Sequence, residues 1–268
     1  MASLFRSLPQ AVSLVADGDS LAITKLNPVA ALRELVAAGR RNLRLVGVPT
    51  AGFGADLLAA AGALASVEAG ALVTGNHGTA PNVVRGVEAG DIRLIESSCP
   101  MIELQLLAGM SGLTFTQVPG LAGSDILGRR RDIRSVPDPF DPGYEVFLAP
   151  ALRPDVAIVH GLRADPHGNV VVSTLTEDRL VAKAAKRVIA TVERVCEEAL
   201  AKLSPEEEVV PEMYFDAIAV VPGGARPFAC PGHYDEDAAA IAAWMAAARS
   251  SETMLAHLAG LMREPADA

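Results

Sequence analysis

Apolar residues along the chain gather in short runs that alternate with longer stretches of helical spacing. The short runs are typical of buried strands, and they lie at residues 20–24, 42–48, 72–74, 92–95, 113–118, 157–160, 170–172, 188–192 and 216–221. Apolar residues recur every three or four positions, as on one helix face, at residues 28–38, 55–62, 81–90, 100–109, 176–187 and 235–262. The alternation predicts an α/β fold: a mostly parallel sheet with helices on both faces, in three layers, α/β/α.

The chain contains neither an internal repeat nor a clear linker that would divide it. Its 268 residues are enough to bury a substantial core. We therefore expect residues 1–268 to form a single α/β domain, with C-terminal helices from about residue 235.

The predicted strand at 92–95 stops on polar residues. Glu96, Ser97 and Ser98 follow it directly, and Pro100 suits the first turn of the next helix, with Ser98 as its cap. In an open α/β sheet, ligands bind in the crevice beyond the carboxyl ends of the strands, where these side chains would lie. Two interpretations of Glu96 stay open here: a functional carboxylate that faces a ligand, or a carboxylate favoured at a helix N-terminus by the helix dipole.

Two loops of small and polar residues also follow predicted strands. They are residues 75–82, which include Asn76 and His77, and residues 119–125, which include Ser124. Such loops let a ligand approach backbone N–H groups closely. His77 is either a base or an ordinary hydrogen-bonded loop residue.

The charge of the chain, −9, argues against a nucleic-acid-binding surface, which needs clustered Lys and Arg. We expect the one basic run, Arg129–Arg131 with Arg134, to be a solvated loop, although it would attract an anion such as a nucleotide phosphate.

The three cysteines lack metal-ligand spacing, so we expect no metal site and a reducing compartment. No apolar run reaches the ~18 residues of a membrane span and no secretory signal is evident, so we expect a cytoplasmic protein without membrane contact.

Several local motifs become specific when their order and spacing are taken together. They are Gly78-Thr79-Ala80-Pro81, Gly123-Ser124-Asp125, His160-Gly161-Leu162-Arg163-Ala164-Asp165, Lys183-Ala184-Ala185-Lys186-Arg187-Val188-Ile189 and Gly224-Ala225-Arg226-Pro227-Phe228. With them, the chain resembles the α-type subunit of family I coenzyme A transferases, and most of all the α-type chain of glutaconate coenzyme A-transferase. The resemblance covers roughly the whole chain.

This resemblance implies a coenzyme A transferase-like fold and a heteromer with a β-type partner chain. In these transferases the nucleophile is a glutamate of the β-type chain, within a Ser-Glu-Asn-Gly-like motif, and it forms a glutamyl–coenzyme A thioester. This chain contains no Glu-Asn-Gly, so the resemblance assigns to it a wall of the pocket and donors for the developing oxyanion. It implies an acyl-coenzyme A substrate and no permanently bound cofactor.

The resemblance also selects candidate site residues. Glu96 would act as a base or as a polar wall of the pocket. Asn76, Ser97 and Ser98 would orient the acyl group, and Ser124 would line the same crevice. No residue of this chain is assigned to hold coenzyme A itself.

Two departures from the family pattern keep other functions open. Residues 23–28, Ile-Thr-Lys-Leu-Asn-Pro, replace a glycine-rich turn that is associated with the oxyanion hole in the transferases. The triplet at 96–98 stands where many relatives have Glu-Tyr-Ser, and one branch of the family uses a glutamate at this strand end to hydrolyse coenzyme A thioesters of steroid-ring remnants. The alternatives are a hydrolase subunit that opens a cyclic ketone thioester with Glu96 as acid or base, and a non-catalytic module that senses acyl-coenzyme A or a sugar phosphate.

Overall fold

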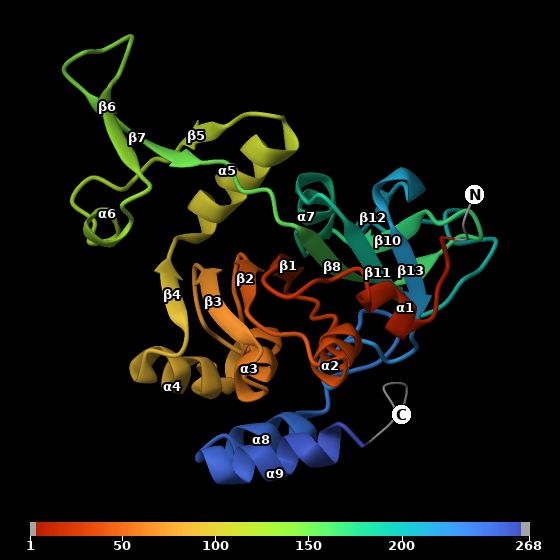
Figure 1. Ribbon diagram of the computed structural model, residues 1–268. Helices are drawn as coiled ribbons and strands as arrows, with labels where there is room; N and C mark the ends of the chain where they lie inside the picture. The colour runs from red at the N-terminus through yellow and green to blue at the C-terminus, as the bar shows by residue number, and fades with distance from the viewer. Residues whose placement is uncertain (1–3, 264–268) are drawn as a thin grey trace.

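The computed structural model describes residues 4–263, and a parallel sheet forms its centre (Figure 1). Its strands are β1 (Ser20–Thr24), β2 (Leu43–Val48), β3 (Leu64–Ala69), β4 (Arg93–Glu96), β8 (Val156–Gly161), β11 (Val188–Val192) and β13 (Ala217–Val220). They lie in the order β13–β11–β8–β1–β2–β3–β4, and every neighbouring pair is parallel. The prediction of a mostly parallel sheet is confirmed.

Helices cover both faces of this sheet, as predicted. One face carries α1 (Leu8–Val12), α2 (Val29–Ala37), α3 (Phe53–Ala60) and α4 (Pro81–Ala89), and the other carries α5 (Cys99–Met110) and α7 (Asp178–Ala184). Successive side chains of a strand point to opposite faces, so Leu21 and Ile23 pack into the first core and Ala22 into the second.

The expected C-terminal helices form a hairpin outside this sandwich. α8 (Ala238–Ala247) and α9 (Ser251–Leu261) lie beyond α3, as Figure 1 shows. Residues 264–268 of the expected C-terminal region lie outside the described residues. Among the helices of residues 4–263, none combines the length and apolar character that crossing a bilayer requires.

Two small antiparallel sheets extend the main body. β9 (Arg163–Ala164), β10 (Val170–Ser173) and β12 (Glu207–Val210) form one; β5 (Phe115–Gln117), β6 (Arg134–Pro137) and β7 (Glu145–Pro150) form the other, with α6 (Ile126–Arg129) between β5 and β6. The second sheet projects beyond α5 (Figure 1), and we call residues 113–150 the arm. Residues 135–144, which contain three prolines, supply most of β6 and the turn into β7.

The predicted strand at 72–74 is wrong, and the third strand of the sheet is β3 instead. Residues 72–74 contribute only an isolated bridge between Val73 and Thr79. The sequence of β3, Leu-Ala-Ser-Val-Glu-Ala, contains few residues of high strand propensity. Pairing with β2 and β4 on its two sides therefore establishes this strand, and a local pattern cannot show that pairing.

In the sequence, Gly109 follows the last apolar residues of the predicted helix and could end it, but α5 does not end there. The helix continues to Met110, and Gly109 lies inside it. A Cβ at this position would lie 2.0 Å from the Leu152 carbonyl oxygen, so the glycine permits a close crossing of helix and chain.

Candidate functional site at the carboxyl edge of the sheet

The carboxyl ends of the parallel strands lie along one edge of the sheet, and the chain changes direction across the sheet between β1 and β8. Ligands of open α/β sheets bind at such a point. A cavity of about 270 Å³ lies at this edge on the β1–β3 side of that point, and its walls include Thr24 at the end of β1 and Lys25, Thr50, Gly75 and His77 from the loops after β1, β2 and β3. This edge of the sheet is therefore the first candidate site.

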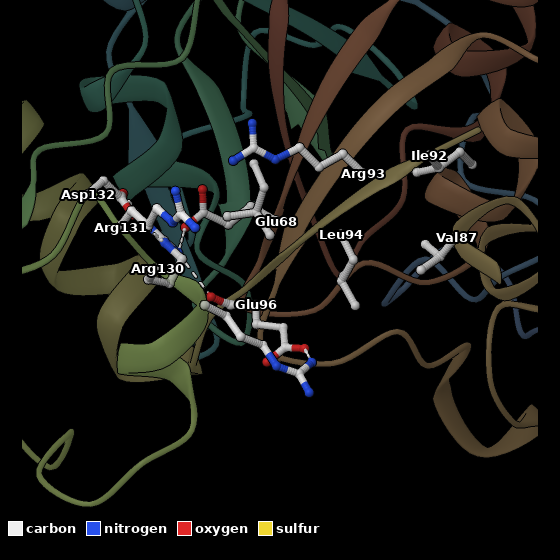
Figure 2. Close-up of a pocket in the computed structure, with 11 residues that line it drawn as sticks. Glu68, Val87, Ile92, Arg93, Leu94, Glu96, Arg130, Arg131 and Asp132 are labelled. Carbon is white, nitrogen blue, oxygen red and sulfur yellow. Dashed lines mark hydrogen bonds and ion pairs between the residues drawn. The ribbon is translucent and has the colours of Figure 1, made fainter. Parts of the chain in front are cut away.

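Glu96 ends the edge strand β4 and lines a second, larger cavity of about 840 Å³ (Figure 2). Its carboxylate forms an ion pair with Arg129 of α6, and 29% of the Glu96 side chain stays exposed. The pair offsets the charge of the carboxylate and holds it against the arm. Because both partners remain accessible to solvent, such a pair contributes only about 0–1 kcal/mol to stability.

Arg130 joins the arm to the main sheet through a buried ion-pair cluster. Its side chain is 6% exposed and donates to Glu68 Oε1 of β3 at 2.8 Å and to the Glu96 carbonyl oxygen at 3.0 Å. Two bonds of 2.9 Å connect it to both carboxylate oxygens of Asp132. Burial raises the pKa of Glu68, and the attraction and hydrogen bond of Arg130 oppose that rise. The expectation of a solvated basic loop is therefore wrong for Arg130, because Glu68, which is distant in sequence, and the nearby Asp132 pair with it in a buried position.

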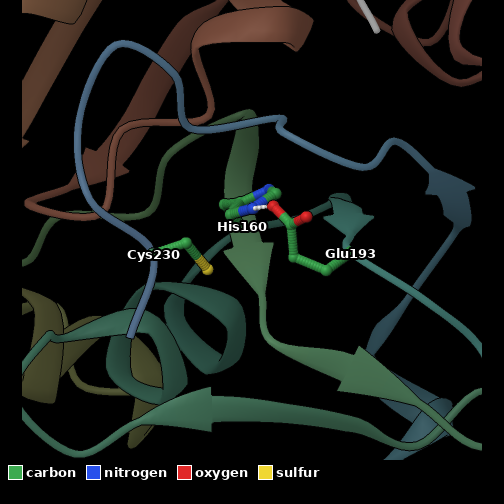
Figure 3. Close-up of side chains that lie close together, drawn as sticks. All are labelled: His160, Glu193 and Cys230. Carbon is green, nitrogen blue, oxygen red and sulfur yellow. Dashed lines mark hydrogen bonds and ion pairs between the residues drawn. The ribbon is translucent and has the colours of Figure 1, made fainter. Parts of the chain in front are cut away.

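A second buried network lies at the carboxyl ends of β8 and β11 (Figure 3). His160 contacts Thr191 through Nδ1 and Glu193 through Nε2, both at 2.7 Å. The Tyr234 hydroxyl and the Gly223 N–H donate to the Glu193 carboxylate at 2.7 and 2.8 Å. Burial opposes ionisation of Glu193, but the hydrogen bonds from His160, Tyr234 and Gly223 outweigh it and lower its pKa to about 2.

Cys230 completes a potential set of three metal ligands in this network. Its Sγ and the ligand atoms of His160 and Glu193 lie within 4.8 Å of one another. Burial and the Glu193 charge raise the pKa of the Cys230 thiol to about 12, which keeps the sulfur protonated. Both His160 nitrogens already have partners, whereas a metal needs a thiolate and a free imidazole nitrogen. The set fits a closed hydrogen-bond network better than a metal centre.

Buried polar contacts hold the turn after β1, where the resemblance leads one to expect glycines. The Thr24 hydroxyl donates to Asp178 of α7 at 2.5 Å, and the Asn27 side chain accepts from the Gly54 N–H at 3.3 Å. Burial raises the pKa of Asp178 to about 6, against the effect of hydrogen bonds from Thr176 and Thr24. Residues 24–28 adopt no positive φ, so the turn does not need glycine for its backbone.

Residues 5–220 of the chain match the family model of the coenzyme A transferases. The chain belongs to this family. It is 31% identical to the A-type chain of 3-oxoadipate CoA-transferase from Pseudomonas knackmussii, over 100% of this chain and 96% of that protein. The family and the subunit type that the motifs predict are thereby confirmed.

Solved structures agree with this assignment. The crystal structure of glutaconate coenzyme A-transferase from Acidaminococcus fermentans matches with a TM-score of 0.87 and 25% identity, over 96% of this chain and 88% of that chain. A variant of the decarboxylase AibA/AibB matches with a TM-score of 0.81 and 32% identity, over 97% and 98% of the two chains. The coenzyme A transferase-like fold is confirmed.

In this coenzyme A transferase chain, Glu96 and the two serines after it lie together between β4 and α5. Glu96 lines the larger cavity, and Ser97 and Ser98 do not. Ser97 is buried, and the Ser98 hydroxyl caps α5 by accepting from the Met101 N–H at 3.4 Å. The predicted cap of this helix by Ser98 is therefore confirmed, and the Glu96 side chain faces the cavity instead.

Neither Asn76 nor Ser124 lines the cavity that Glu96 lines. Asn76 is exposed in the 3₁₀ turn η1 (Gly75–His77), and Ser124 accepts from the Ile126 N–H at 3.2 Å in the turn before α6. Within residues 4–263, no hydrogen bond joins either residue to Glu96. His77 pairs with Glu236 at 3.2 Å, as an ordinary loop histidine would. The binding roles of Asn76 and Ser124 stay predictions.

Sequence reasoning missed the buried charged groups around the site. Glu68 lies within β3, and Glu193 directly follows β11. The sequence does contain a signal for them, because each acid lies inside or immediately after an apolar strand. A buried charge at such a position costs free energy unless it is paired, so the position indicates a partner. Their partners, Arg130 and His160, come from segments that only the tertiary structure brings near.

Glu193 makes a contribution to stability that depends on pH and can be tested. Because folding lowers its pKa from 4.5 to about 2, its stabilising effect is present above pH 4.5 and is lost as the pH falls toward 2. That shift corresponds to roughly 3 kcal/mol at neutral pH. We expect Glu193→Gln to be less stable than the wild type at pH 7, with the difference shrinking between pH 4.5 and pH 2. Urea unfolding across this range measures it, and a difference independent of pH would contradict the assignment.

Proposed function

We propose that this chain is the α-type subunit of a heteromeric coenzyme A transferase, which moves coenzyme A between an acyl thioester and a carboxylic acid. The observation that carries the proposal is the similarity, along the entire chain, to the A-type chain of a CoA-transferase. The smaller cavity at the carboxyl edge of the sheet and the larger cavity along β4 support it, because they provide a place for an acyl group. The coenzyme A thioester is then a substrate, and no permanently bound cofactor is needed.

In this proposal the partner subunit supplies the nucleophile, because this chain contains no Glu-Asn-Gly sequence. A partner carboxylate oxygen attacks the thioester carbonyl carbon, the C–S bond breaks, and coenzyme A leaves as the thiolate. The acyl group is then joined to the partner glutamate as a mixed anhydride. The thiolate attacks the glutamyl carbonyl carbon of this anhydride, the first acid leaves as the carboxylate, and a glutamyl–coenzyme A thioester remains. A second acid reverses these steps. Glu96 of this chain stands beside the acyl group as a polar wall or base.

A decarboxylase subunit is the second candidate, and the similarity to the decarboxylase AibA/AibB favours it. These relatives do not favour the hydrolase or the sensor alternative. The transferase proposal comes first because the family model and the full-length relative both carry that name.

Purification of the tagged chain from its native cells tests the proposal. We expect a co-purifying protein of similar size that carries Ser-Glu-Asn-Gly or a near variant. The complex should exchange labelled coenzyme A between acyl thioesters and free acids without releasing carbon dioxide. Recovery of only this chain, or carbon dioxide release without exchange, would count against the transferase.

We place part of the partner contact on the arm. Three of its aromatic side chains are strongly exposed: Phe140 at 95%, Tyr144 at 60% and Phe115 at 54%. Exposed aromatic side chains on a projecting sheet are typical anchors of protein interfaces, whereas a free surface seldom keeps them.

We expect Phe140→Ser to weaken binding of the partner subunit about 30-fold, the effect of losing an interface residue worth about 2 kcal/mol. The isolated chain should unfold at the same temperature, since Phe140 buries almost nothing in it. Surface plasmon resonance with the partner measures the change. Met213→Ser, at a residue 78% exposed in η2 (Glu212–Tyr214), is the matched control and should bind normally. Equal affinities for wild type and Phe140→Ser would remove the arm from the interface.

A further inference from the structure

A further cavity, of about 810 Å³, lies between the C-terminal helical hairpin and the main body. Its walls come from α2, from the loop after β13 and from α8 and α9, and we call it the hairpin cavity. Among the described lining residues, it shares only Phe53 with the cavity of about 270 Å³ and none with the cavity that Glu96 lines. Its volume is in the range of small-molecule sites, and the proposed transferase function gives it no task.

One wall of the hairpin cavity is apolar and rich in aromatic rings. The ring centroids of Phe53 and Trp244 are 4.7 Å apart, and His257 packs its edge against Trp244 at 5.8 Å. Aliphatic side chains and prolines complete this wall: Val29, Pro222, Pro227, Ala240, Ala243 and Leu261. The wall favours a ligand with an apolar body, and an aromatic ring would extend the packing of the rings already there.

The two acids of the cavity already have donors from the protein. The Glu193 carboxylate accepts from the Tyr234 hydroxyl and the Gly223 N–H, and Asp237 caps α8 by accepting from the Ala240 N–H at 2.9 Å. Neither carboxylate therefore needs a cation or a donor from a ligand.

Three of the four basic side chains of the cavity are also engaged or weakly charged. Arg33 of α2 donates to the Leu261 carbonyl oxygen at the end of α9, and His257 packs against Trp244. Burial lowers the pKa of His233, so this imidazole carries little charge at pH 7.

Arg226 is the exception among the cations. Its side chain is exposed, lines the cavity, and forms no side-chain hydrogen bond or ion pair within residues 4–263. Its guanidinium lies over the Tyr234 ring, 4.5 Å from the ring centroid. A guanidinium in this position keeps its N–H groups for a planar anion, and it occupies the ring face that a cationic ligand would need. The cavity is therefore suited to an anion.

We propose that the hairpin cavity binds a small aromatic anion, with Arg226 on its carboxylate or phosphate and with Phe53 and Trp244 against its ring. An aromatic carboxylic acid and a purine nucleotide share this chemistry. The site is separate from the cavities assigned to the acyl group, and the proposal does not depend on the transferase function.

Trp244 is the only tryptophan of the chain, so its fluorescence reports on this cavity alone. The test titrates the full-length chain with 4-nitrobenzoate, whose ring quenches tryptophan fluorescence, and N-acetyltryptophanamide corrects for absorption and collisional quenching. We expect saturable quenching. Nitrobenzene, which has the same ring without the charge, should bind at least about 10-fold more weakly, because it makes no charge-assisted hydrogen bond.

Arg226→Gln should raise the Kd for 4-nitrobenzoate about 10- to 100-fold, and Arg226→Lys should lie between it and the wild type. Arg249→Gln is the matched control, because Arg249 is an exposed arginine between α8 and α9 that does not line the cavity. Its Kd should equal that of the wild type.

A pair of substitutions on α8 tests the cavity without changing a charge. Ala243→Phe places a ring in the cavity and should raise the Kd at least about 10-fold. Ala242→Phe, at the neighbouring exposed alanine that does not line the cavity, should leave the Kd unchanged. Thermal unfolding of each variant shows that it is folded.

Competition with benzoate and with AMP identifies the source of the anion. Displacement of 4-nitrobenzoate at lower concentrations of benzoate would assign the cavity to an aromatic acid, and displacement at lower concentrations of AMP would assign it to a nucleotide. Displacement by neither, quenching that does not saturate, or a Kd unchanged in both Arg226→Gln and Ala243→Phe would overturn the inference. These measurements do not involve coenzyme A transfer, so they stand apart from the test of the proposed function.

Discussion

Glu96→Gln is expected to lower the kcat of the assembled enzyme about 100-fold or more, within the range of about 10²–10⁴ that a positioned acid or base contributes. Glutamine keeps the size of the side chain and an oxygen that accepts from Arg129, but it carries no charge and takes up no proton. Because the ion pair is exposed, the free energy of unfolding should change by about 1 kcal/mol or less. Coenzyme A transfer and thermal unfolding of the purified complex measure the two effects.

Glu88→Gln is the control for this substitution. Glu88 is an exposed carboxylate of α4 that does not line the cavity, so its loss removes the same charge without touching the site. An unchanged kcat in Glu96→Gln would exclude Glu96 from the chemistry. A complex that fails to assemble would show that Glu96 acts on the interface instead.

Arg130→Met is expected to destabilise the chain by roughly 3–5 kcal/mol, the usual effect of removing one partner from a buried ion pair. The Glu68 carboxylate, which is 8% exposed, would lose its cation while it remains buried. Asp132 is 45% exposed and can turn to water, so Glu68 accounts for most of the loss. Denaturant unfolding measures the change, and the arm should exchange its amide hydrogens faster because its connection to β3 is broken.

A second substitution separates the charge from the shape of Arg130. Glu68→Leu combined with Arg130→Met should recover most of the stability, because apolar residues of similar volume often replace a buried ion pair without loss. Arg129→Met, which removes an exposed neighbouring guanidinium, should change the free energy of unfolding by about 1 kcal/mol or less. Additive losses in the double variant would show that Glu68 and Arg130 do not stabilise each other.

The sequence alone determines the layers of this protein and several of its strands. The predicted strands at 20–24 and 188–192 coincide with β1 and β11, because a strand buried on both faces is a continuous apolar run. The cap of α5 by Ser98 is also local, since the donor and acceptor are three residues apart. The motifs that identify the family are short segments, so their order and spacing can be recognised in the sequence alone.

The tertiary structure decides the features that depend on partners far apart in the chain. β3 is a strand because β2 and β4 flank it, and Gly109 is required because the chain at Leu152 crosses α5. Arg130 of the arm is buried because Glu68 of β3, 62 residues earlier, pairs with it where the arm contacts the main sheet. The same folding brings Arg129 to Glu96 and makes the cavity beside β4. The sequence alone indicates Glu96 as a candidate, because it stands at the end of a predicted strand. It does not indicate the residues around Glu96, because these come from distant segments that meet only when the chain is folded.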